Sequence, residues 1–171
     1  SEIPLSASHA WVLSKQLYTA KEINHKGKIW SLAFNTTKGD LTRNLTVYIA
    51  QTSSSYASWD VITEANRVFS GEVTFTAGQW NTIYFDKPFE YDGKSNVVVV
   101  VDDNTGKSSG YRGVLTHYIF YGDSGCSILY DDQKDIDPLD GESISNASNS
   151  NSYSYKNEIK ITFGEYPLPY S

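Results

Sequence analysis

Short hydrophobic runs recur along the chain, and clusters of Gly, Asn, Asp, Ser and Thr separate them. Within residues 44–51 (NLTVYIAQ) every second position is a large apolar residue, and this period of two is that of a strand with one buried face. About nine or ten such strands, with no helices between them, predict a two-sheet antiparallel β-sandwich or jelly roll. The other runs that we read as strands are 16–20, 28–34, 67–75, 81–85, 96–102, 113–120, 127–130 and 157–163.

Two of these regions leave local alternatives open. Ser70 and Gly71 interrupt the run 67–75, which predicts either a hairpin or a single bulged strand. Residues 57–66 (ASWDVITEAN) could hold one short helical turn, with Ser58 or Asp60 as its cap.

Five consecutive valines, at 97–101, lie between Asn96 and Asp102. A solid apolar run of this length predicts a central strand with both faces covered. The opposing sheet would cover one face, and a crossing loop, such as the polar segment after Asp131, would cover the other. We expect Trp80, which follows Gly78, to pack into the core at a strand entrance rather than to bind a ligand.

The length of 171 residues suits one domain, which we place at 1–164, and the Pro-containing residues 165–171 read as the start of a linker. Residues 131–155 are first acidic and then nearly low-complexity, which predicts a long surface loop or an edge excursion. The chain contains no Met, so we interpret it as a mature protein or an excised module, monomeric by default.

Charge and composition exclude several classes of function. The net charge of −6 argues against nucleic acid as a partner, because phosphate binding needs a basic stripe. No apolar run approaches the roughly 20 residues of a membrane span. The single Cys126 excludes an internal disulfide, and we expect it to be buried and inert. No nucleophile, metalloprotease or nucleotide-binding motif occurs, so we expect no enzymatic activity.

Aromatic residues without an obvious packing role are the candidate ligand contacts. Flat rings stack on the C–H faces of sugars or form the centre of a protein interface, and Arg adds directional hydrogen bonds. The candidates are Tyr56, Trp59, Trp30, Tyr111, Arg112, His117 and Tyr121.

Closely spaced aspartates form the candidate metal site. Hard oxygen ligands in a flexible loop that contains Gly suit a structural Ca²⁺ ion, although aspartates also serve simply as turn formers. The candidate ligands are Asp131, Asp132, Asp135, Asp137 and Asp140.

The order of these pieces resembles a known module. The stretches LYTAKEI, GKIWSLAFN, RNLTVYIAQT, VFSGEVTFTAGQWNTIYFDKPFEYDGKSNVVVVVDDNTG and NEIKITFG resemble the cleaved-adhesin modules of the gingipains, within the galactose-binding-like jelly-roll group, which includes carbohydrate-binding modules. The resemblance covers about 9–164 and is most specific at 68–106. It implies a jelly-roll sandwich in a multidomain protein that gut or oral Gram-negative anaerobes secrete or display on the cell surface. Related modules often carry structural calcium.

These observations favour a non-catalytic binding module, with carbohydrate as the favoured ligand. The alternative is a protein-binding adhesin or structural spacer, whose partner is a host protein or a neighbouring domain. A glycan-active enzyme on the same fold is the third reading, since one fold can host many functions.

Overall fold

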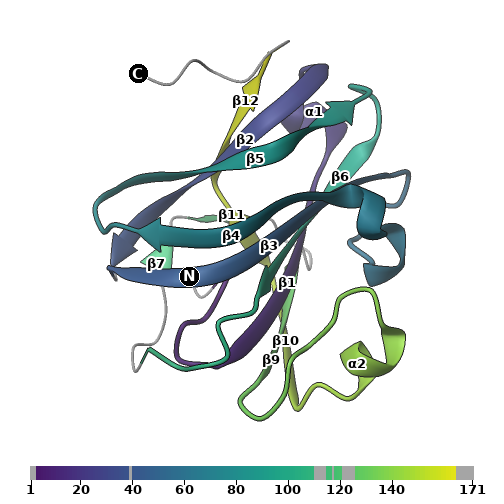
Figure 1. Ribbon diagram of the computed structural model, residues 1–171. Coiled ribbons are helices and arrows are strands. Elements are labelled where there is room, and N and C mark those ends of the chain that lie inside the picture. Colours follow the sequence, from purple (N-terminus) through teal and green to yellow (C-terminus); the bar gives the residue numbers. More distant parts are fainter. Residues whose placement is uncertain (1–2, 39, 110–114, 117, 121–125, 165–171) are drawn as a thin grey trace.

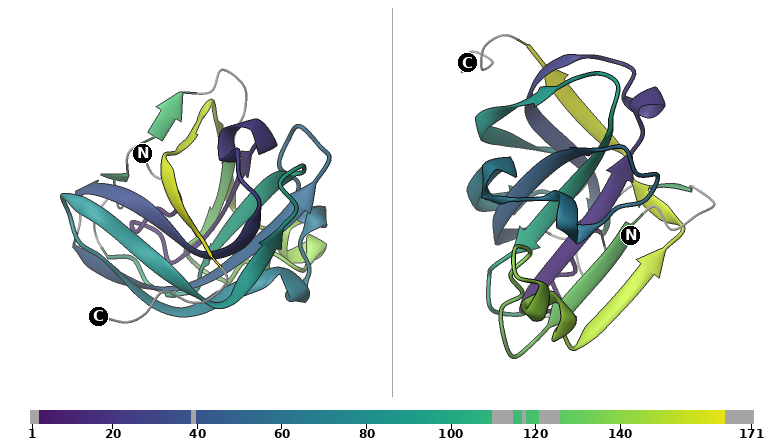
Figure 2. Two further views of the ribbon diagram at one scale, coloured as in Figure 1. Left: turned by 90° about the horizontal axis from the view of Figure 1, so that it is seen from above. Right: turned by 90° about the vertical axis from the view of Figure 1, so that its right-hand side faces the viewer.

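A computed structural model of the chain describes residues 3–38, 40–109, 115–116, 118–120 and 126–164. Two antiparallel sheets lie over each other (Figures 1 and 2), and they confirm the predicted β-sandwich. In spatial order, the larger sheet consists of β10 (Asn149–Tyr153), β9 (Cys126–Asp131), β1 (Trp11–Tyr18), β6 (Asn96–Asp103), β3 (Leu41–Thr52) and β4 (Arg67–Phe75).

The smaller sheet has three main strands, and two short ladders extend the structure. Its order is β12 (Ile159–Phe163), β2 (Gly27–Lys38) and β5 (Gln79–Tyr91), and β7 (Leu115–Thr116) also pairs with β2. Strands β8 (Tyr118–Phe120) and β11 (Tyr155–Asn157) pair separately. None of the helices in the described part of the chain is long and apolar enough to cross a membrane.

The valine strand β6 lies at the centre of the larger sheet, between β1 and β3, and both of its faces are buried. Val97, Val99 and Val101 belong to the core between the sheets, whereas Val98 and Val100 belong to a second apolar cluster on the outer face. The prediction of a central strand covered on both sides is therefore confirmed.

Segments distant in sequence cover the outer face of the larger sheet. The 3-10 turns η1 (Trp59–Val61) and η2 (Glu64–Asn66) and helix α2 (Gly141–Ser145) lie on the same side of the molecule (Figure 2). Ile62, beside η1, and Ile136, before α2, are both buried against this face. The polar segment after Asp131 thus supplies part of the cover that the sequence predicted.

Several local expectations are refined. Residues 67–75 form one bulged strand rather than a hairpin. The register with β3 shifts opposite Val68, whereas Ser70 and Gly71, from which the bulge was predicted, pair in register. Strand β3 is buried on both faces rather than one, because Tyr48 on its second face lies under the cover of the outer cluster. Cys126 is buried, and burial raises its pKa to about 12, which agrees with an inert thiol.

Trp80 does not occupy the core. It is half-buried on β5, whose neighbouring residues Asn81 and Ile83 are buried, and the ammonium of Lys160 lies 4.4 Å from the centroid of its ring. The expectation of a core anchor was wrong because the position is out of phase with the inward-facing residues of its strand. Phe89, farther along β5, does pack in the core.

Helix α1 (Ala20–Ile23) was not predicted from the sequence, although its cap is visible there. Thr19 and Glu22 form a reciprocal capping box, in which each side chain accepts a hydrogen bond from the other residue's backbone N–H. The carboxylate of Glu22 also accepts a 2.6 Å hydrogen bond from the buried ammonium of Lys156, which ties this end of the sandwich to β11.

A buried ion pair anchors the opposite end of β6. Nε of Arg43 on β3 donates to the carboxylate of Asp103 on β6 at 2.7 Å, and both side chains are almost fully buried. The two remaining guanidinium nitrogens donate to the carbonyl oxygens of Lys107 and His9 at 2.7 and 2.8 Å. One arginine therefore joins a strand, the loop after β6 and the segment before β1.

We expect Arg43→Met to lower the free energy of unfolding by roughly 3–5 kcal/mol, because it leaves the Asp103 carboxylate buried without its partner. Urea unfolding at neutral pH measures the change. The matched control is Lys28→Met, which breaks the exposed Lys28–Glu90 pair and should cost less than about 1 kcal/mol. Equal losses in the two variants would contradict the structural role of Arg43.

Candidate functional site

A groove of about 210 Å³ opens on the outer side of the larger sheet, between the loop before η1 and the edge strand β10. Strand β1 contributes its floor, and β9 and β10 contribute hydroxyl groups. The described residues that line it are Lys15, Tyr56, Ala57, Cys126, Ser127 and Ser152.

Tyr56 is the most exposed large hydrophobic residue at this groove, with 67% of its surface accessible. Its loop is held by short-range hydrogen bonds: the backbone N–H of Tyr56 donates to the hydroxyl of Ser54, and that of Ser54 donates to the hydroxyl of Thr52. The amide of Asn96 on β6 binds the carbonyl oxygen of Ser54 at 2.9 Å. The ring thus extends from a loop whose backbone is tied to the central strand.

Trp59 lies beneath this loop rather than at its tip. It begins η1, where Ser58 is the N-cap, and it packs half-buried against the outer apolar cluster. The Nζ atom of Lys15 lies 4.5 Å from the centroid of the indole ring. Burial lowers the pKa of Lys15, and the negative charge of Asp60 partly opposes that effect.

The structure brings only part of the predicted ligand set together. Tyr56 and Trp59 share the loop at the groove, whereas Trp30 lies on β2 of the other sheet, where its Nε1 donates to the carbonyl oxygen of Gly164. Trp30 is half-buried there. The remaining candidates lie outside the described residues, and they are Tyr111, Arg112, His117 and Tyr121.

Sequence reasoning missed Lys15, Ser127 and Ser152 as groove residues. The sequence does contain an indication for Lys15, because it lies on the same face of β1 as the apolar residues Leu13 and Leu17. A charged residue in a buried phase often marks a function. The two serines have no comparable signal, since they come from strands that only the tertiary fold places beside β1.

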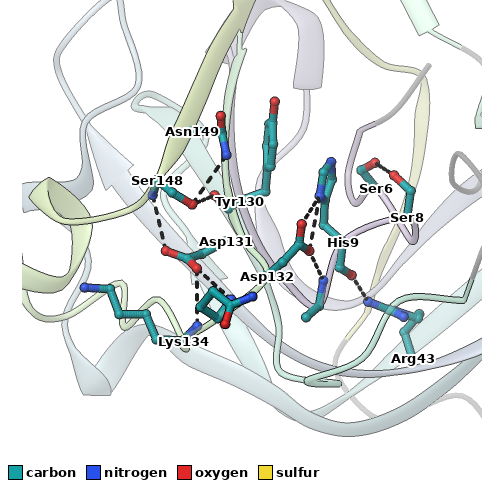
Figure 3. Close-up of polar contacts among 12 residues, drawn as sticks. Ser6, Ser8, His9, Arg43, Tyr130, Asp131, Asp132, Lys134, Ser148 and Asn149 are labelled. Atoms are coloured by element: carbon teal, nitrogen blue, oxygen red, sulfur yellow. Dashed lines mark hydrogen bonds and ion pairs between the residues drawn. The ribbon is translucent and has the colours of Figure 1, made fainter.

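Asp131 and Asp132 are neighbours in sequence, but their carboxylates make separate contacts (Figure 3). Asp131 accepts hydrogen bonds from the backbone N–H groups of Gln133, Lys134 and Ser148. Burial alone would raise the pKa of Asp131, but these hydrogen bonds outweigh it and lower the pKa.

Asp132 instead joins the segment before β1. Its carboxylate accepts from the backbone N–H of Ala10 at 2.9 Å and contacts Nδ1 of His9 at 3.2 Å, and the His9 ring stacks on Tyr130 (Figure 3). The hydrogen bond from Ala10 is the main cause that lowers the pKa of Asp132.

The other predicted metal ligands also serve turns. Asp137 accepts from the backbone N–H of Leu139, and Asp140 is the N-cap of α2, whereas Asp135 is exposed. Within the described residues, no three His, Cys, Asp or Glu side chains form a group that could hold a metal ion. Structural calcium stays a prediction, and a melting temperature unchanged by EDTA in the purified protein would contradict it.

An acidic centre lies under the segment that leads to α2. Asp102 is 6% exposed and shares the outer phase of β6 with Val98 and Val100. Burial raises its pKa to about 8, and the negative charges of Asp135, Asp103 and Asp137 add to this effect. A hydrogen bond from Asn104 lowers the pKa and opposes it in part. Burial also raises the pKa of the neighbouring Tyr48 to about 12, and the negative charges of Asp102, Glu64 and Asp137 add to the effect.

Comparisons with known proteins place the chain in no family. No protein-family model matches it, and no curated protein matches it. Among solved structures it is similar to the cysteine protease and lectin-like domains of Cwp84, a surface layer associated protein of Clostridium difficile, at 18% sequence identity and a TM-score of 0.49. The alignment covers 91% of this chain and 32% of that one, so the chain spans about a third of its length. None of this points to the gingipain-type modules specifically.

We expect Asp102 to make stability depend on pH. The pKa of Asp102 is higher in the folded chain than the ordinary value of 3.8, so the folded chain holds its proton more tightly than the unfolded chain does. The protonated Asp102 therefore contributes fully to the free energy of unfolding below about pH 4, and this contribution is lost as the pH rises through about 8. Asp102→Asn should therefore be more stable than the wild type at pH 8, by more than about 1.4 kcal/mol, the value of one pKa unit. Urea unfolding at pH 4, 6 and 8 tests this.

A parallel pH profile for Asp102→Asn and the wild type would contradict the prediction. Asp140→Asn provides the control, because an asparagine also caps a helix and Asp140 is exposed. This variant should leave the difference between pH 4 and pH 8 unchanged.

Proposed function

We propose that the chain is a non-catalytic carbohydrate-binding module, and that the groove beside Tyr56 is its binding site. The observation that carries the proposal is an exposed aromatic ring on a tethered loop, next to two serine hydroxyls and a lysine. An aromatic face packs against the C–H groups of a sugar ring, and hydroxyl and ammonium groups bind the sugar's oxygen atoms.

The size and lining of the groove support binding of a polymer. Its volume of about 210 Å³ is below the roughly 300–1,000 Å³ of pockets that enclose small molecules, so a ligand would extend beyond it, as a polysaccharide chain does. Hydrolysis of glycosides uses two facing carboxylic acids, and the described residues that line the groove include none. A secreted or cell-surface protein is the setting that we infer for such a module.

Protein binding is the second candidate, and it has its own supporting observation. Tyr84 is 58% exposed on β5, on the outer side of the smaller sheet, and the half-buried Trp80 lies on the same face of that strand. Exposed tyrosine and tryptophan are the residues most enriched at the energetic centre of protein interfaces. The two candidates therefore depend on different tyrosines.

We expect Tyr56→Ala to weaken binding to a retained polysaccharide about 10-fold, because it removes a stacking contact of about 1–1.5 kcal/mol. Affinity electrophoresis against a panel of plant, microbial and host polysaccharides identifies the ligand, and titration calorimetry measures the loss. Tyr56→Phe keeps the ring and should bind nearly as the wild type does.

Tyr84→Ala is the matched control, since it removes a tyrosine of similar exposure from the other sheet. It should leave polysaccharide binding unchanged. If no polysaccharide in the panel retards the wild-type protein, or if Tyr84→Ala and not Tyr56→Ala abolishes binding, the groove is not a carbohydrate site.

A further inference from the structure

The ammonium group of Lys15 has an unusual environment at the floor of the groove. It extends from the outer face of β1, between Leu13 and Leu17, which are almost fully buried in the outer cluster. Among the described residues its Nζ atom has no hydrogen bond and no ion pair, and its close contact is the face of Trp59. A half-buried cation therefore meets a ring on one side and the open groove on the other.

This arrangement leaves the charge incompletely compensated. The indole face stabilises a cation less than a charge-assisted hydrogen bond to a carboxylate does when water is excluded. Burial disfavours the charged form of Lys15, and Asp60 is the one acidic group that acts on it in the described structure. An anionic group in the groove would offset the cost of burying the ammonium.

The neighbours of Lys15 indicate what would carry that anion. Tyr56 offers a ring face, and the hydroxyls of Ser127 and Ser152 can donate and accept hydrogen bonds. A neutral sugar would contact the ring and form hydrogen bonds with the hydroxyls and the ammonium, but it would leave the positive charge of Lys15 unpaired. A sugar whose C6 is a carboxylate would use all three kinds of group and pair the charge.

We propose that the groove binds an acidic polysaccharide, and that the carboxylate of a uronic acid residue pairs with the ammonium of Lys15. This inference rests on the proposed function, and it specifies the class of ligand at the same site. Stacking on Tyr56 and hydrogen bonds to Ser127 and Ser152 position the sugar ring, and Lys15 selects for the acid.

The test uses oligosaccharides that differ only in oxidation at C6. Trigalacturonate and triglucuronate are compared by titration calorimetry with the neutral galactose and glucose trisaccharides of the same linkage. The wild type should bind one of the acidic trisaccharides at least about 10-fold more tightly than its neutral counterpart, a difference of about 1.4 kcal/mol.

Two variants separate the charge of Lys15 from its packing. Lys15→Met keeps a long unbranched side chain against Trp59. It should weaken binding of the acidic trisaccharide about 10-fold more than binding of the neutral one, which loses only a hydrogen bond from the ammonium. Asp60→Asn removes the opposing charge and should tighten acid binding about twofold. Circular dichroism and the melting temperature check that both variants are folded.

The outcomes distinguish this inference from the proposed function. Equal binding of acidic and neutral sugars by the wild type, still sensitive to Tyr56→Ala, would overturn the selection for acids and leave the carbohydrate module standing. Acid binding that Lys15→Met does not weaken would likewise overturn it, because Lys15 would then only pack on Trp59. Failure of every sugar and polysaccharide to bind would overturn both.

Discussion

The fold depends on hiding one strand, β6, from water on both faces. Its valines cannot alternate between a core and solvent, so each face needs its own apolar partner. The smaller sheet covers Val97, Val99 and Val101, and loops from two distant parts of the chain cover Val98 and Val100. Fully burying one such side chain contributes about 1.5–3 kcal/mol, so the loops are structural elements as much as connections.

Because both faces of β6 are covered, the two aspartates at its end, Asp102 and Asp103, are also buried. Their environments differ. Asp103 faces the inner side and pairs with Arg43, so its charge is matched within the core. Asp102 faces the outer side, where burial and other carboxylates raise its pKa to about 8. Through Arg43, Asp103 is connected to the segment before β1, whereas Asp102 is a carboxyl group with a raised pKa among the residues on the outer face.

The candidate groove is formed in part by the loop that covers the outer face of the larger sheet. The loop after β3 places Trp59 on the sheet to help bury β6, and this leaves Tyr56 at its exposed turn, above Lys15. The loop after β3 therefore both covers the outer face of the sheet and lines the proposed binding groove. The proposed selectivity for acids follows from a lysine that occupies an apolar phase of β1, where its charge meets an aromatic ring instead of a carboxylate.

Periodicity and composition by themselves determined most of the strands, the two-sheet class and the double burial of the valine run, because these depend on local spacing and total apolar content. They did not reveal the polar edge strand β10, which has no apolar period. The capping box of α1 was also readable in Thr19 and Glu22, but four residues are too short for a helical period. Only the tertiary structure decided that Asp131 and Asp132 make separate contacts, and that Ser127 and Ser152 meet Lys15 beside Tyr56. Those outcomes depend on strand register and on which distant segments cover a sheet face, and neither is encoded in the spacing of neighbouring residues.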